Sequence, residues 1–240
     1  MSHLTAAIRQ PNYGLGIAKG LYWNISHVHK FGAVPAMSQN QTGTIWDVND
    51  TNYTWSSWSS AGTLDIPAVN ASDNGLQVTI EGLDANYAVQ SETVTVSSSA
   101  TTTTTKSFIR AFRAYSDATN VANINIQKSA VTVARITAGK AQTLMAIYTV
   151  PAGHTAYLLN GTASCQSGAD ATGDMYVRYF GQTSFRVGHS FEVSGAGGQY
   201  MYNFEIPIKI PEKSDIDVRA TVRSNNARVT AAFDLILDND

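Results

Sequence analysis

The segment Thr143-Leu-Met-Ala-Ile-Tyr-Thr-Val150 places apolar or aromatic side chains at about every second position. Four later segments repeat this alternation: Asp174-Met-Tyr-Val-Arg-Tyr-Phe180, Tyr200-Met-Tyr-Asn-Phe-Glu-Ile206, Asp215-Ile-Asp-Val-Arg-Ala-Thr-Val222 and Ala227 to Leu237. A period of two residues is typical of β-strands that bury one face against a core. The sequence from about residue 131 onward therefore predicts a series of strands.

Turn-forming residues separate these predicted strands, for example in Pro151-Ala-Gly153 and Gly195-Ala-Gly-Gly198. Pro207 and Pro211 flank the segment 208–210, which we expect on a sheet edge or in a crossing loop because proline lacks a ladder donor. No repeat of fixed period is apparent, which argues against a solenoid or propeller. We predict an all-β fold, an antiparallel β-sandwich of jelly-roll type.

The pattern divides the chain into three parts. Residues 1–30 contain Gly and Pro with isolated anchors at Tyr22 and Trp23, which predicts an extended N-terminal arm lying on another surface, either of its own domain or of a neighbour. Residues 31–106 are expected to form a smaller N-terminal β subdomain, and residues 107–240 the jelly-roll-like sandwich. The Thr-rich run 97–105 lies at the division, where stiff β-branched Thr favours an exposed strand or edge loop over a flexible linker.

The composition is poor in charge. Only 14% of the residues are charged, against roughly a quarter in typical proteins, and a surface with few charges favours contact with other proteins. The 16 Lys and Arg residues are matched by 18 Asp and Glu residues and form no run, so we predict no nucleic-acid partner.

The single cysteine, Cys165, excludes an intrachain disulfide, and we expect it to be a small buried side chain. The N-terminus lacks the basic start and apolar core of a signal peptide, and no stretch approaches the ~18 apolar residues of a membrane span. We therefore expect no membrane partner and assembly in a cytoplasm.

Two segments carry side chains that could bind a metal. His27 and His29 would share one face of a strand, but nothing nearby completes a tetrahedral site, and polar residues at a strand end or subunit contact are the simpler interpretation. The segment 47–52 alternates Asp and Asn, yet it lacks the turn Gly and the closing Glu of an EF-hand, so we expect an Asx-rich turn. We predict no metal site and no cofactor.

Catalytic motifs are missing as well. Ser190 could be combined with any His and Asp, but the sequence has no nucleophile elbow or comparable signature, and we predict that the protein is not an enzyme. Asp215 and Asp217 share a strand face, where Lys213 and Arg219 favour a solvated charge ladder.

Aromatic residues provide the one binding signal. The rings in Tyr53-Thr-Trp-Ser-Ser-Trp58 could stack on a sugar, but large amphipathic rings among Ser and Thr also mark a subunit interface or a core, and we favour these two interpretations. The candidate protein-interface residues are Tyr22, Trp23, Trp46, Tyr53, Trp55 and Trp58.

Several segments also occur together in a characteristic order. They are His27-Val-His-Lys-Phe-Gly32, Thr44-Ile-Trp-Asp47 with Tyr53-Thr-Trp55, Ile80-Glu-Gly-Leu-Asp-Ala-Asn-Tyr87 with Glu92-Thr-Val-Thr-Val96, Tyr148-Thr-Val-Pro-Ala-Gly153, Ile210-Pro-Glu-Lys-Ser-Asp-Ile-Asp-Val218 and Phe233-Asp-Leu-Ile-Leu237. This order resembles virion structural proteins of tailed bacteriophages, especially marine cyanophage-like phages, from about residue 27 to the end. In those proteins the Gly-Leu-Asp turn is commonly followed by a second turn around Asn-Gly, where this chain has residues 97–105 instead.

The resemblance implies a non-enzymatic part of the phage particle, with no catalytic residues to carry over. We expect a head accessory or decoration subunit that self-associates, with a trimer preferred, and docks on another virion protein such as the major capsid protein. It would be located in the virion after assembly in the host bacterial cytoplasm. The alternatives are a tail or neck component, a host-receptor (carbohydrate) binding protein and, last, a hydrolase.

Overall fold

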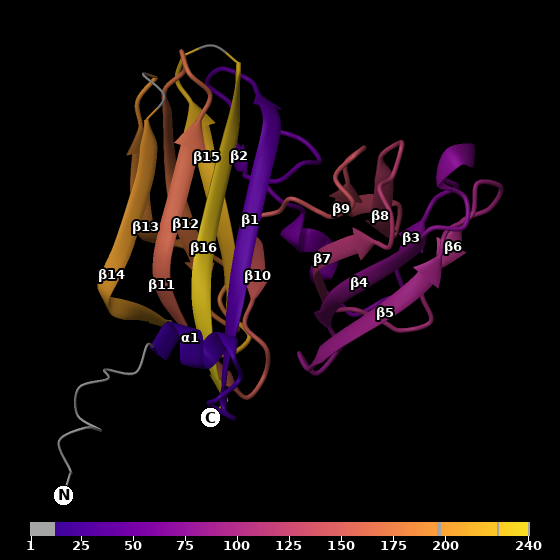
Figure 1. Cartoon of the computed structure of the whole chain (residues 1–240), viewed down its shortest axis with the longest axis horizontal. Coiled ribbons are helices and arrows are strands. Elements are labelled where there is room, and N and C mark those ends of the chain that lie inside the picture. The colour runs from indigo at the N-terminus through magenta and orange to yellow at the C-terminus, as the bar shows by residue number, and fades with distance from the viewer. Residues whose placement is uncertain (1–12, 196–197, 225, 240) are drawn as a thin grey trace, which may run out of the picture.

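The computed structural model describes residues 13–195, 198–224 and 226–239 (Figure 1). Residues 1–12 of the predicted N-terminal arm lie outside the described residues. Residues 25–30 of the predicted arm are part of a sheet of the fold itself, because strand β1 (Ile25–Met37) pairs from its first residue with β16 (Ala227–Asn239). In the segment between residues 12 and 25, helix α1 (Tyr13–Ala18) packs against β1.

Two larger antiparallel sheets form one side of the molecule (Figure 1). The first sheet has the order β1-β16-β11-β14, where β11 is His154–Cys165 and β14 is Gln199–Ile210. The second sheet has the order β10-β15-β12-β13, with β2 also pairing with β15. Its strands are β2 (Thr42–Thr44), β10 (Ile147–Thr149), β12 (Ala171–Arg178), β13 (Arg186–Val193) and β15 (Asp215–Val222).

One hydrophobic core joins these two sheets. In β16, alternate side chains from Ala227 to Leu237 are buried, as a two-residue period requires. Phe233 and Leu235 of this strand belong to the same cluster as Val177 and Val218 of the second sheet. Each such side chain contributes about 1.5–3 kcal/mol when it is fully buried. Cys165 is buried in this core as a free thiol, as predicted.

The other side of the molecule is a smaller pair of sheets. One has the order β6-β3-β8-β9 and the other the order β5-β4-β7. Their strands are β3 (Asp65–Ile66), β4 (Gln77–Leu83), β5 (Val89–Thr95), β6 (Thr102–Thr103), β7 (Arg110–Ser116), β8 (Ile124–Lys128) and β9 (Val131–Ile136). Two 3-10 helices, η1 (Trp55–Trp58) and η2 (Ala71–Asp73), lie in the connecting segments. A second hydrophobic cluster fills this part of the molecule.

The prediction of an all-β antiparallel fold is confirmed. The jelly-roll type is not confirmed, because a jelly roll has two sheets and the described strands divide among four. Four sheets is the number in a four-bladed propeller-like arrangement, an architecture that the lack of a sequence repeat argued against. Pro207 lies in β14, which is an edge strand, and β6 in the Thr-rich run is also an edge strand, both as expected.

The strand pairing does not follow the predicted division at residue 106. β7 follows that division in sequence but pairs with β4, which precedes it. β1 and β2 precede the division but pair with strands of the C-terminal half. Alternation shows that a segment is a strand, whereas its partner is determined by long-range packing. No helix among the described residues has the length and apolar character needed to cross a membrane.

Candidate functional site

The six aromatic residues predicted at a protein interface lie in two environments. Four of them are buried inside the chain: Trp46, Tyr53, Trp55 and Trp58. The interface prediction is corrected for these four, because a buried ring cannot contact a partner or a sugar. Trp23 is 92% exposed and Tyr22 is half-buried, and for these two the interface role stays a prediction.

Tyr53 is the centre of the buried aromatic cluster. Its ring centroid lies 5.0 Å from that of Trp46 and 4.8 Å from that of Trp55, and both pairs meet edge to face. Each pair of this kind contributes about 0.5–1.5 kcal/mol beyond burial. Trp58 Nε1 donates a hydrogen bond of 2.9 Å to Tyr53 Oη, and burial raises the pKa of Tyr53 far above its usual value. The cluster is therefore a neutral, rigid packing unit.

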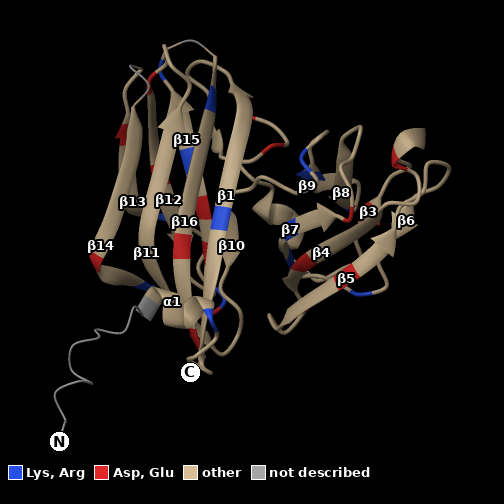
Figure 2. Cartoon of the chain, viewed as in Figure 1, with Lys and Arg blue, Asp and Glu red and all other residues tan. Residues whose placement is uncertain are grey.

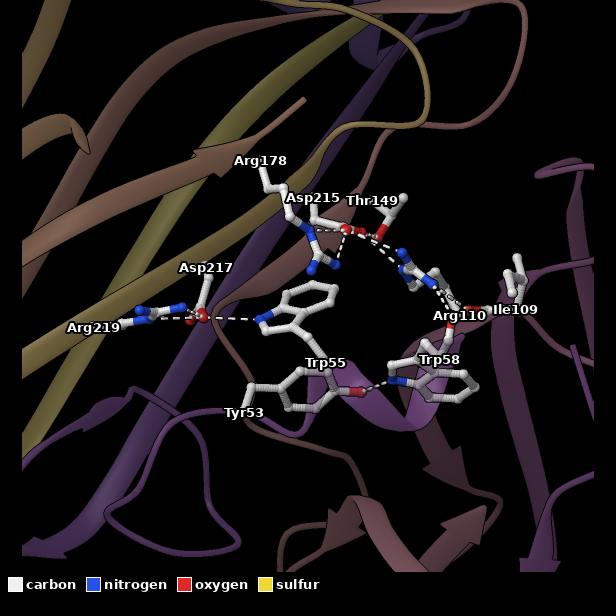
Figure 3. Close-up of polar contacts among 10 residues, drawn as sticks. All are labelled: Tyr53, Trp55, Trp58, Ile109, Arg110, Thr149, Arg178, Asp215, Asp217 and Arg219. Atoms are coloured by element: carbon white, nitrogen blue, oxygen red, sulfur yellow. Dashed lines mark hydrogen bonds and ion pairs between the residues drawn. The ribbon is translucent and has the colours of Figure 1, made fainter. Parts of the chain in front are cut away.

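Asp215 of β15 binds side chains from both parts of the molecule (Figure 3). Arg110 of β7 binds its carboxylate with two hydrogen bonds, Nε to Oδ1 at 2.8 Å and Nη2 to Oδ2 at 3.0 Å. Arg178 of β12 donates to Oδ2 at 2.5 Å, and Thr149 of β10 donates to Oδ1 at 2.6 Å. One carboxylate thus joins three strands to β15, including one from the smaller part.

Asp217 makes the second group of contacts in this network (Figure 3). It accepts hydrogen bonds from Trp55 Nε1 at 2.9 Å, Thr44 Oγ1 at 2.7 Å and Arg219 Nε at 2.9 Å. The predicted solvated charge ladder is wrong, because both Asp215 and Asp217 are buried. The segment that carries η1 covers this face of β15, and the sequence contains no local signal for such a cover.

The network has three guanidinium groups and two carboxylates, so it carries an excess of positive charge. The aromatic rings partly offset this excess, since Arg110 and Arg178 lie 5.6 Å and 5.4 Å from the centroid of the Trp55 ring. Both carboxylates are held as acceptors by fixed donors. The arrangement can hold the two parts of the chain together, and it presents no nucleophile to a substrate.

The histidine pair forms a polar contact at the edge of the first large sheet. His27 Nε2 and His29 Nδ1 lie 3.0 Å and 2.7 Å from the same oxygen, Asp234 Oδ1. Although burial acts in the opposite direction, these contacts and Asn160 hold the pKa of Asp234 below its usual value. Across the part of the chain that the structure describes, no three His, Cys, Asp or Glu side chains are grouped to hold a metal.

The Asp- and Asn-rich segment 47–52 forms a turn. Asn49 accepts hydrogen bonds from the backbone and side chain of Thr51, and Asp47 accepts one from Thr137 Oγ1 at 2.8 Å. Burial raises the pKa of Asp47 to about 6. The Asp47 side chain therefore binds another residue of the same chain and does not contribute an oxygen ligand to an open cation site.

Ser190 donates to Asp174 Oδ1 at 2.6 Å, while the adjacent His189 contacts Tyr200. Successive side chains of a strand point to opposite faces, so this Ser and this His are separated by the sheet. Neither contact is part of a nucleophile–base–carboxylate arrangement.

An exposed apolar edge is the surface feature that sequence analysis missed. β13 and β14 are the edge strands of the two large sheets, and His189 lies in one aromatic cluster with Tyr200, Tyr202 and Phe204 between them. Four apolar side chains on these strands are exposed: Val187 at 55%, Met201 at 63%, Tyr202 at 45% and Ile206 at 83%. We name these four residues the β13–β14 edge. The sequence signal for this exposed surface is that the strand segment 200–206 has apolar residues on both of its faces.

Comparisons with known proteins assign no family to this chain. No family model matches it, and no curated protein matches it. Among solved structures, it is similar to the infectious bursal disease virus Gx strain, with 8% identity, a TM-score of 0.24, and coverage of 90% of this chain and 72% of that chain. A mutant VP2 protein of infectious bursal disease virus in T=1 particles gives 8% identity, a TM-score of 0.19 and coverage of 90% and 73%. Both are viral capsid structures, but values this low establish neither fold nor function, and they provide nothing specific to tailed phages.

Proposed function

We propose that this protein is a non-enzymatic structural subunit of a virion, in particular a head accessory or decoration subunit that self-associates and docks on the major capsid protein. The virion role rests on the ordered segments that resemble tailed-phage structural proteins. The observation that carries self-association is the β13–β14 edge, where large apolar side chains are exposed on two neighbouring edge strands.

An exposed edge with apolar side chains favours association for two reasons. Its outer backbone groups can pair with another strand, and its side chains gain free energy when they leave water. β13 and β14 carry four charged residues, Arg186, Glu192, Glu205 and Lys209, and Figure 2 shows acidic residues on both strands. We therefore expect the exposed apolar side chains to form the centre of the contact and these charges to lie at its rim. A trimer is the assembly that we expect.

The same surface argument separates this proposal from carbohydrate recognition. The rings of Trp55 and Trp58 that suggested a sugar site are buried, so the segment 53–58 offers no open aromatic face to a sugar. The absence of a nucleophile, base and orienting group in one place among the described residues is the basis for proposing a non-enzymatic role.

Sedimentation of the purified protein tests the proposal. The double substitution Met201→Glu with Ile206→Glu introduces two charges into the β13–β14 edge, and we expect it to weaken self-association at least about tenfold because charges are depleted from interface cores. Val121→Glu is the matched control, since Val121 is 64% exposed in the smaller part of the molecule.

The experiment is repeated across a salt series and with undecorated phage heads. We expect weak salt dependence, because apolar contacts are not screened as exposed ion pairs are. A strict monomer that never sediments with the particles would contradict the proposal. Retention of that monomer on a host glycan would favour the receptor-binding alternative.

A further inference from the structure

A groove of about 670 Å³ lies between the two parts of the molecule, on the side opposite the β13–β14 edge. Residues 26–30 of β1 line one wall, and residues 89–91 of β5 line the facing wall. The groove also contains Lys106, Glu81 of β4, and Phe112 and Arg113 of β7. It is separate from the arginine–aspartate network around Asp215.

The charge of this groove is opposite to that of the chain. The chain has a formal net charge of −2, whereas the groove is lined by three cations and a single carboxylate, besides His27 and His29. The carboxylate, Glu81, lies 3.5 Å from Arg113. Lys30 and Lys106 form no ion pair among the described residues, although Glu81 acts on Lys30 at longer range and Glu92, outside the groove lining, acts on Lys106.

Lys30 is an unusual residue to find at the base of a groove, because it is buried and forms no ion pair among the described residues. Its Nζ donates to the carbonyl of Phe112, which is free because the ladder between β4 and β7 shifts by one residue at this point. A single carbonyl uses only one of its three donors. Burial, and then the nearby Arg113, lower the pKa of Lys30 to about 7 against the opposing effect of Glu81, and a bound anion would act in the same direction as Glu81.

β1 also presents an unpaired backbone edge to this groove. It is the terminal strand in its sheet, and among the described residues the backbone groups from 26 to 31 make ladder bonds with β16 alone. An extended peptide can add to such an edge through main-chain hydrogen bonds. In an added strand, every second side chain would face the same wall of the groove.

We propose that this groove binds an extended acidic peptide segment of a partner protein, which pairs with the edge of β1 and places carboxylates against Lys30, Lys106 and Arg113. The edge supplies the backbone pairing, and the cations supply the preference for acidic side chains. The inference does not depend on self-association through the β13–β14 edge, because β1 and β14 are the opposite edge strands of the first large sheet and β13 belongs to the second.

The probe is a blocked, fluorescein-labelled octapeptide in which Glu and Thr alternate, measured by fluorescence anisotropy at pH 6.5 and low salt. The matched peptide has Gln in place of every Glu. We expect the acidic peptide to bind at least about tenfold more tightly, with an affinity that falls as salt rises. On binding, the amides of residues 26–31 should become protected from hydrogen exchange.

Variants of the exposed cations test the charge contribution without disturbing the core. Arg113→Gln and Lys106→Gln should each weaken the acidic peptide by roughly two- to fivefold, as expected for partly exposed charge pairs. Lys30→Met should weaken it more, roughly tenfold, because the ammonium is desolvated. Lys209→Gln, an exposed change on β14, is the control and should leave binding unchanged.

Three outcomes would overturn the inference. The first is equal binding of the Glu and Gln peptides, and the second is a loss caused by Lys209→Gln that matches the loss caused by Arg113→Gln. The third is that inorganic sulfate protects residues 26–31 as fully as the peptide does, which would show that the groove recognises a point anion only.

Discussion

The substitution Asp215→Asn is expected to destabilise the fold by about 3–5 kcal/mol, the usual cost of removing one partner from a buried ion pair. The change keeps the size of the side chain and removes its charge. Arg110 and Arg178, which have side-chain exposures of 8% and 19%, then lose their shared carboxylate. Two guanidinium groups remain close together in a poorly solvated site, where they repel each other.

Hydrogen-bond geometry makes the loss specific to this position. Asp215 accepts from Arg110 and Thr149 at Oδ1 and from Arg110 and Arg178 at Oδ2. Asn offers one acceptor oxygen, and its amide nitrogen would face the N–H donors that previously bound the second oxygen. Neither rotamer of Asn therefore satisfies all the donors around it.

Urea unfolding followed by tryptophan fluorescence is the assay, because Trp55 and Trp58 lie beside the network and report directly on its opening. Glu205→Gln is the matched control, since it makes the same carboxylate-to-amide change on the exposed part of β14 and should cost less than about 0.5 kcal/mol. A free energy of unfolding for Asp215→Asn within about 0.5 kcal/mol of the unaltered protein would refute the argument that this carboxylate holds the two parts together.

Three further predictions follow from single positions. Trp55→Phe leaves a smaller aromatic ring and removes the donor to Asp217, and it should lower the free energy of unfolding by about 1.5–3 kcal/mol in the same urea assay. Burial raises the pKa of Asp47 to about 6, so between about pH 4 and pH 6 the folded state binds a proton that the unfolded state has released. Stability should therefore fall as pH rises through this range. Asp47→Asn should abolish this fall and stabilise the protein at pH 7 by up to about 3 kcal/mol. Gly32→Ala should lower the melting temperature sharply, because an added Cβ would lie 2.2 Å from the carbonyl oxygen of Ile45 and 2.4 Å from the nitrogen of Ala146.

Each of these has a result that contradicts it. Trp55→Phe with unchanged stability would show that its indole N–H contributes nothing to the network. An Asp47→Asn variant with the same decline between pH 4 and 6 would place the titrating group elsewhere. For Gly32→Ala, the control is Gly161→Ala, where the nearest heavy atom is 4.0 Å away, and equal melting temperatures for the two variants would exclude the steric argument.

Local pattern predicted the strands well and their assembly poorly. The alternations at 174–180 and 215–222 correspond to β12 and β15. Pairing of β7 with β4 across a predicted domain boundary carries no such local pattern. Strand formation depends on neighbouring residues, whereas pairing depends on which distant segments bury their apolar faces together.

The candidate sites show the same contrast. Trp55 and Trp58 have the composition expected of an interface, and only the path of the chain over β15 shows that they are core. Lys30 follows two histidines in an ordinary strand sequence, and only the approach of β7 shows that its ammonium is buried at the base of a groove. A side chain's identity sets what it can donate or accept, but its burial is set by segments that are distant in sequence.

The sequence by itself determined that this protein is an antiparallel all-β chain with few charges, a free buried cysteine and no recognised catalytic motif, because these properties depend on composition and two-residue periodicity. The tertiary structure alone decided that the strands form four sheets, that Asp215 and Asp217 are buried between arginines, and that apolar side chains are exposed on β13 and β14. The physical reason is that periodicity records which face of a strand is apolar, while long-range packing determines what covers that face.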